Sequence, residues 1–273
     1  MNQSFQVLEG LTFKGRTERV GIVIPDMHIA PPGDLNGGVD GAALKCLLQA
    51  IEIVTPDFIT YIGDLGEWSS VNHYEWAKRK RPLLRDTLDL LECDAVAVNK
   101  VLDQIDNAAT HVQNTYVTLG NHEAWLDNLV SEVPQLHDTF TPRQLIGAKK
   151  RSYQCFDHGR WVKFGKLHLS HGTEASGTNY CRSMLLRAGT SIMFGHTHSC
   201  QSSSISTLGG YHKAWSIGCI ANMDKPFLRG RVTNWGHAFA ILHISKSGLF
   251  NVEIVEIYNG TCWVYGNKVT GNT

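Results

Sequence analysis

Small groups of Asp, Asn and His side chains stand along the chain, each directly after a run of apolar residues. They are Asp26 with His28, Asp64, Asn121 with His122, His171, and His196 with His198. Carboxylate, amide and imidazole donors without a thiolate form a set that suits Mn, Fe, Zn, Ni or Co. The set is larger than a single tetrahedral site requires. It suits two divalent metals roughly 3.5–4 Å apart that share a bridging carboxylate, an arrangement that holds both oxygens of an in-line phosphoryl displacement.

Each of these residues also has an ordinary structural explanation when it is taken alone. Asp26 and Asn121 could cap helices, which is the commoner use of Asp or Asn after a strand. His171 could be a hydrogen-bonded histidine of the protein interior. The pair His196 and His198, however, places two donors at positions i and i+2, where a turning backbone lets them hold one ion from neighbouring directions. Helix caps and isolated histidines do not explain such donors at one strand end after another, so we favour the metal site.

The elements that must position these donors follow from apolar runs and their breaks. Short β-branched or apolar runs predict strands at 20–25, 57–62, 115–119, 161–164, 166–170 and 190–194. Helical patterns cover 39–54, 74–107 with a break at Pro82, most of the region up to 145, and 176–188. Ligands bind beyond the carboxyl ends of strands in an open α/β sheet, so the donors that follow these strands should converge.

The order of these elements predicts an α/β protein. The first half reads as βαβαβ and the part after residue 201 as short strands that alternate with turns. This order favours a layered sandwich with helices outside the sheets. Because no repeat, low-complexity tract or Pro/Gly/Ser linker divides the chain, we expect one domain that spans residues 1–273.

Composition limits the classes of protein that remain. Lys and Arg total 25 and Asp and Glu total 25, so the formal charge of the 273-residue chain is zero, which argues against a polybasic DNA-coating module. Two bound divalent cations would reverse the charge of one cleft, however, so nucleic acid remains open as a partner. The chain has seven Cys without a C-x-x-C pair, which argues against a zinc ribbon or a disulfide framework. With no visible signal peptide or membrane-spanning run, we expect a cytoplasmic protein that has no membrane partner; its oligomeric state is open.

Taken in order, the motifs resemble those of the calcineurin-like metallophosphoesterases. The motifs are Asp26-Met27-His28, Gly63-Asp64-Leu65-Gly66-Glu67, Gly120-Asn121-His122-Glu123, the isolated His171 and Gly195-His196-Thr197-His198. Order, spacing and strand placement agree with that family over roughly residues 20–198. The resemblance implies a layered α/β/β/α sandwich of two mixed β-sheets flanked by helices. The segments 215–219 and 224–239 resemble phage- and prophage-encoded members, which would place the protein in the cytoplasm of a bacterial host cell.

The resemblance also assigns roles to the donors. One metal would be held by Asp26, His28 and His198. The other would be held by Asn121, His171 and His196, with Asp64 bridging the two. His122 is similar to the family's histidine that protonates the leaving oxygen, and a metal-bridging hydroxide would be the nucleophile. Manganese is the first expectation for the two divalent cations, with Fe, Zn, Ni or Co as alternatives.

We therefore expect a phosphodiesterase that acts on DNA, RNA or nucleotide phosphodiesters. The alternatives are a phosphomonoesterase or protein phosphatase of the same family, a metal-binding scaffold without catalysis, and a single-zinc enzyme of another fold. The last would leave Asp64 and Asn121 without a role. For contacts with the substrate we propose His73, Arg229 and Trp235, and for Glu67 and Glu123 hydrogen bonds that support the ligands.

Overall fold

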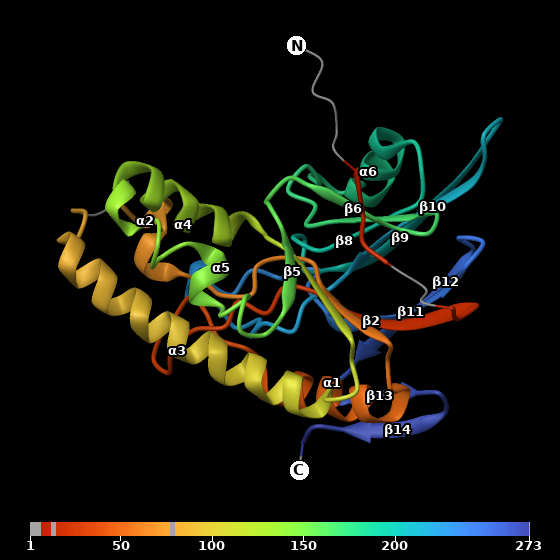
Figure 1. Ribbon diagram of the computed structural model, residues 1–273, viewed down its shortest axis with the longest axis horizontal. Helices are drawn as coiled ribbons and strands as arrows, with labels where there is room; N and C mark the ends of the chain where they lie inside the picture. The colour runs from red at the N-terminus through yellow and green to blue at the C-terminus, as the bar shows by residue number, and fades with distance from the viewer. Residues whose placement is uncertain (1–6, 12–14, 77–79, 273) are drawn as a thin grey trace.

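The computed structural model describes residues 7–11, 15–76 and 80–272, and these form two six-stranded sheets and a small third one (Figure 1). The first large sheet has the order β12 (Phe250–Ile257), β11 (His237–Ser245), β2 (Glu18–Ile24), β3 (Phe58–Tyr61), β4 (Asn114–Thr118) and β5 (Tyr153–Phe156). Strands β2 to β5 are parallel, whereas β11 pairs antiparallel with both β2 and β12. The carboxyl ends of β2, β3 and β4 therefore lie at one edge.

The second large sheet is also mixed. Its order is β1 (Val7–Glu9), β6 (Trp161–Phe164), β7 (Leu167–Ser170), β8 (Ile192–Phe194), β10 (Gly210–Ile217) and β9 (Cys200–Thr207). Strands β6 and β7, both expected from the sequence, form a hairpin, and Gly165 at its turn has a φ of 62°, which favours glycine. Because β7 and β8 are parallel, their carboxyl ends also share an edge.

Helices cover the outer faces of both sheets. The helices are α1 (Gly41–Val54), α2 (His73–Trp76), α3 (Leu84–Ala108), α4 (Asn121–Glu132), α5 (Pro142–Leu145) and α6 (Tyr180–Ala188). Helices α1 and α3 lie along one side of the molecule and α6 lies on the opposite side, as Figure 1 shows. The third sheet, β13 (Thr261–Val264) with β14 (Asn267–Thr270), packs against α1. No helix among the described residues is long and apolar enough to cross a bilayer.

The described residues form three apolar cores between these layers. Ile24 of β2 packs with residues of α1 and α3, whereas its neighbour Val23 points to the other face and packs with residues of the second sheet, such as Phe164. A third core joins Met184 of α6 to Phe194 of β8. Helix, sheet, sheet and helix therefore follow one another, which confirms the expected α/β/β/α sandwich of two mixed sheets.

Most expected elements are present with shifted ends. Residues 80–83 are not helical, as expected around Pro82, and part of the break, at 77–79, lies outside the described residues. Helix α6 begins at Tyr180, later than the expected residue 176, because Gly177 has a φ of 77° that a right-handed helix does not contain. Strands β1 and β5 were not predicted, because each is short and lies at the edge of its sheet.

Candidate metal centre

The expected ligands meet where the two sheets present their carboxyl strand ends to each other. Asp26 follows β2, Asp64 follows β3, and Asn121 opens α4 directly after β4. From the other sheet, His171 follows β7 and His196 follows β8. The backbone N–H of His196 donates to Asp26 Oδ2 over 2.8 Å, so the two sheets are hydrogen-bonded to each other inside the site.

One group of converging donors is formed by Asp26, His28 and His198. Asp26 Oδ2 lies 3.1 Å from His198 Nε2, and the Nε2 atoms of His28 and His198 lie 2.9 Å apart. Glu67 Oε2 lies 2.8 Å from His28 Nδ1, so the carboxylate holds the proton of His28 on Nδ1 and leaves a lone pair on Nε2. All three side chains are buried. The group has the composition of a site for one divalent cation.

A second group is formed around His171. Its Nδ1 donates to the carbonyl oxygen of Ile62 over 2.8 Å, so in the neutral ring Nε2 carries the lone pair. That Nε2 lies 2.9 Å from Asn121 Oδ1 and 3.2 Å from Asp64 Oδ2. The ring of His196 completes the group, with its centroid 5.1 Å from that of His171.

Asp64 lies between the two groups. A single oxygen, Oδ2, is 3.2 Å from His171 Nε2 and 3.7 Å from His28 Nε2, whereas Oδ1 accepts the backbone N–H of His122 over 2.9 Å. One carboxylate oxygen that faces both groups is the arrangement that a bridging ligand requires. The donors on this chain therefore fit two neighbouring divalent cations.

The electrostatics of the site favour cations. Burial opposes protonation of His171, but the carboxylate of Asp64 outweighs burial and raises the pKa of His171 to about 10. Burial would raise the pKa of Asp64, yet the adjacent His171 and His122 hold it well below its ordinary value. Burial raises the pKa of Glu67 to about 7. The buried carboxylates thus create a strong preference for positive charge at the point where the donors meet.

The glycines of the motifs allow the backbone to approach the ligands. A Cβ atom on Gly63 would collide with the ring of His171, one on Gly120 with the carboxylate of Asp64, and one on Gly195 with that of Asp26. Only Gly63 has a positive φ, of 107°. At Gly63 the turn and the missing side chain are both required, whereas at Gly120 and Gly195 only the missing side chain is.

The expected ligands hold strained backbone conformations. His28, Asp64, His196 and His198 have φ values of 47°, 46°, 64° and 56°, in the left-handed region that residues other than glycine rarely adopt. Strain of this kind persists where the surrounding structure imposes it, and it clusters at functional sites. The turns after the strands therefore hold the donors in place at a cost in stability.

His122 lies beside the two groups and not within them. Its Nδ1 donates to the backbone oxygen of Glu67 over 2.7 Å, and its Nε2 lies 4.0 Å from Asp64 Oδ2. The ring is half-buried and packs on Trp125, with the centroids 3.9 Å apart. This places Nε2 at the cavity next to the ligands.

Glu123 supports the loops that carry the ligands. The carboxylate is fully buried and accepts the backbone N–H groups of Asp64, Leu65, Gly66 and Gly120 over 2.9–3.2 Å. It also accepts the indole N–H of Trp68 over 3.0 Å. The loops after β3 and β4 are thus held by one side chain, in agreement with the supporting role expected for Glu123.

A cavity of about 340 Å³ opens onto the ligands. Trp235 lies in its wall, with its ring centroid 4.6 Å from that of His198, and its contact with the substrate stays a prediction. The other expected substrate contacts, His73 and Arg229, are not among the described residues that line this cavity, and His73 packs against Trp125 beside it. Their contact with substrate stays a prediction.

Sequence reasoning missed several residues of the cavity wall, above all Lys225. Its side chain is buried, and its Nζ donates to the backbone oxygen of Asn36 over 2.5 Å. Burial lowers the pKa of Lys225. Tyr74, Trp125 and Phe227 also line the cavity. Tyr74 and Trp125 carried a signal in their position close to the motifs, whereas Lys225 and Phe227, in a loop far from any motif, carried none.

Comparison with known proteins finds distant similarities. No model of a protein family matches the sequence. The chain is 26% identical over 272 residues to the gene 54 protein of Mycobacterium phage L5, which covers 90% of this chain and 96% of the phage protein. Among solved structures, Vps29 from Chaetomium thermophilum is 9% identical with a TM-score of 0.43, covering 92% of this chain and 97% of its own. A dimetal phosphatase from Danio rerio is 12% identical with a TM-score of 0.42, covering 93% and 99%.

Proposed function

We propose that this chain is a phosphoester hydrolase of the calcineurin-like metallophosphoesterase type that works with two divalent cations. The observation that carries the proposal is Asp64 Oδ2, which faces His28 on one side and His171 on the other. A scaffold that binds a single ion would not require this shared oxygen. The alternative of one zinc ion would likewise leave the group around His171 without a purpose.

The chain's own residues position the reactants and move a proton. Bound at the two groups, the cations would polarise the phosphoryl group and lower the pKa of an attacking water molecule. His122 Nδ1 donates its proton in a hydrogen bond to the Glu67 carbonyl whether the ring is neutral or protonated. Nε2 is therefore the atom that can release a proton. That atom faces the cavity from beside Asp64. His122 therefore serves as the general acid for the leaving oxygen.

The walls of the cavity support a nucleotide or nucleic-acid phosphodiester as the substrate. Tyr74, Trp125, Phe227 and Trp235 surround the opening with aromatic surface, on which bases stack with little sequence preference. Lys225 adds a positive charge close to the ligands, where it can contact a phosphate oxygen. A phosphomonoester of a small alcohol would leave most of this aromatic surface unused.

The test compares bis-p-nitrophenyl phosphate with p-nitrophenyl phosphate as substrates of the Mn²⁺-loaded protein, alongside a panel of DNA, RNA and cyclic nucleotides. We expect diester turnover that is lost in Asp64→Asn and retained in Asp138→Asn, a matched change at an exposed carboxylate. Turnover of the monoester alone would replace the diesterase by a phosphomonoesterase or protein phosphatase. Two bound metals without any turnover would indicate a non-catalytic scaffold, and one metal per chain would contradict the two-cation centre.

A further inference from the structure

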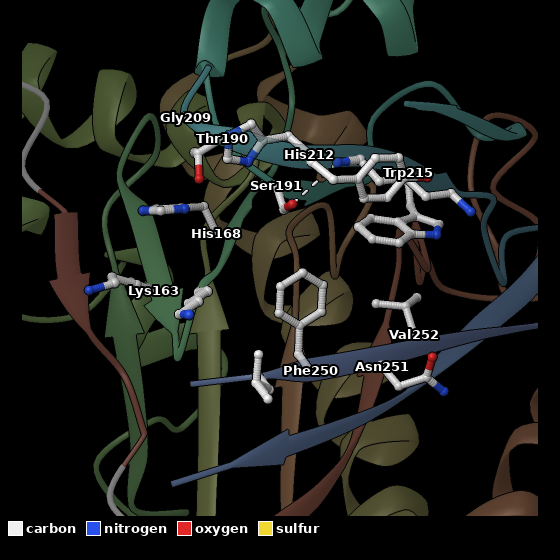
Figure 2. Close-up of a pocket in the computed structure, with 14 residues that line it drawn as sticks. Lys163, His168, Thr190, Ser191, Gly209, His212, Trp215, Phe250, Asn251 and Val252 are labelled. Carbon is white, nitrogen blue, oxygen red and sulfur yellow. Dashed lines mark hydrogen bonds between the residues drawn. The ribbon is translucent and has the colours of Figure 1, made fainter. Parts of the chain in front are cut away.

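A second, larger cavity opens at the opposite edge of the sandwich. The metal ligands follow the carboxyl ends of β7 and β8, whereas this cavity is lined by Lys166 and Ser191, which precede the amino ends of the same strands. Figure 2 shows it between the two sheets, with His212 and Trp215 on one side and Phe250 and Asn251 on the other. Its volume is about 750 Å³. The two cavities are thus separated by the length of the strands.

The lining of this cavity is strongly basic. Lys163, Lys166 and Lys213 contribute to it together with His168 and His212, and the described lining residues include no Asp or Glu. Such a one-sided set attracts an anion that carries more than one negative charge. Lys166 is exposed and Lys213 is half-buried, so solvent reaches both side chains. The charge is local, because the chain as a whole has a formal charge of zero.

The floor of the cavity is apolar and aromatic. Trp215 and Phe250 meet edge to face with their centroids 6.1 Å apart, and Val252 extends the surface on the side of β12. Lys213 Nζ lies 5.2 Å from the centre of the Trp215 ring, so a cation is already held beside the aromatic surface. An inorganic anion would fill only a small part of this volume and would not contact the floor.

We propose that this cavity is a second binding site, distinct from the metal centre, for a nucleoside phosphate. The phosphates lie against Lys166 and Lys213, and the base lies on the apolar surface to which Trp215 and Phe250 contribute. The amide of Asn251 and the hydroxyl of Thr190 are placed to hydrogen-bond the polar edge of the base or the ribose. The site goes beyond the proposed hydrolysis, because it lies at the opposite ends of β7 and β8 from the metal donors, and none of its described lining residues belongs to a candidate metal group.

The experiment measures binding of α,β-methylene-ADP to the metal-loaded protein by isothermal titration calorimetry. This nucleotide is chosen because a methylene group replaces the oxygen between its phosphates. Reversing the charge in K166E/K213E should weaken binding at one site at least about tenfold, since it removes two charge-assisted contacts. The charge-matched control K100E/K268E changes exposed lysines of α3 and β14 and should leave binding unchanged. The neutral variant K166Q/K213Q repeats the test if charge reversal unfolds the protein.

Adenosine and inorganic phosphate serve as the two partial ligands. Binding of the whole nucleotide more tightly than of either part supports the proposal. Equal affinity for phosphate and for the nucleotide would overturn it, as would nucleotide binding that the lysine variants do not alter. Because the measurement is of binding, a failure of the diesterase assay does not change its result. Conversely, if K166E/K213E loses nucleotide binding but retains diester turnover, the loss of binding arises at this site and not from damage to the metal centre.

Discussion

A hydrogen bond on one ring nitrogen decides which nitrogen of a histidine faces the site. His28 and His171 each have Nδ1 engaged, by Glu67 and by the Ile62 carbonyl, so Nε2 is the atom presented to an ion. His122 has its Nδ1 engaged in the same way, but its Nε2 faces the cavity beside Asp64. The residue type is common to all three, and the surrounding backbone suits two of them to the proposed role of metal ligand and one to the proposed role of proton donor.

Replacement of His122 tests that division of roles. Because His122 Nε2 is assigned to the leaving oxygen, His122→Ala should lower kcat about 10²–10⁴-fold for a diester with a poor leaving group. The loss should be much smaller for a nitrophenyl diester, whose leaving oxygen hardly needs a proton. Metal content, measured by elemental analysis, should stay at the wild-type value. Equal losses on both substrates, or the loss of a metal ion, would show that His122 acts as a ligand or a structural residue.

At the scale of elements, sequence periodicity predicted most strands and therefore the edge at which the site forms. Apolar runs that end in Gly-Asp, Gly-Asn or Gly-His mark the ends of β3, β4 and β8 unambiguously. The residues of the cavity wall were harder to predict from the sequence, because Lys225 and Phe227 reach the cavity from a loop whose path depends on tertiary packing. His73 follows directly after the β3 loop, and the structure places it against Trp125 on the neighbouring α4. The position of His73 in the sequence therefore predicted that it lies near the cavity, but not that it packs against Trp125.

Helix α3 carries a buried acid that should make stability depend on pH. Burial raises the pKa of Asp94 to about 6, although the hydroxyl of Ser70 donates to its Oδ2 over 2.9 Å. In the unfolded chain the group loses its proton near pH 4, so between about pH 4 and pH 6 the folded state binds more protons. The free energy of unfolding should therefore fall as the pH rises through that window. Above about pH 6 it should carry the full cost of burying the ionised Asp94.

Asp94→Asn should remove this penalty, because the amide oxygen can still accept the Ser70 hydrogen bond. Urea unfolding at pH 7 should show a gain of about 1–3 kcal/mol, and at pH 4 the gain should nearly vanish. The exposed Asp89 of the same helix provides the control, since Asp89→Asn should not alter the pH dependence. A gain of equal size at both pH values would contradict a cause based on ionisation.

At the scale of the whole molecule, the candidate metal centre lies where the two sheets meet, and its proposed ligands come from both. Asp26 and Asp64 extend from the sheet of β2 and β3, whereas His171 and His196 extend from the sheet of β7 and β8. Hydrogen bonds already cross between them, from the His196 N–H to Asp26 and from His171 to the Ile62 carbonyl. A cation shared between such ligands would add a link between the layers that exists only in the folded chain.

Removal of metal should therefore lower the stability of the whole fold. An ion present at about 100 times its Kd stabilises the folded state by roughly 2.7 kcal/mol, because the unfolded chain does not hold the ligands together. For a chain of this size we expect chelation to lower Tm on the order of 5–10 °C, measured by scanning calorimetry with and without EDTA. Asp64→Asn should have a low Tm in both conditions, since the shared ligand is lost. A chelator effect that persists in full in Asp64→Asn would place the stabilising ion elsewhere in the molecule. An unchanged Tm in the wild-type protein would mean that the centre binds its ions too weakly to link the sheets.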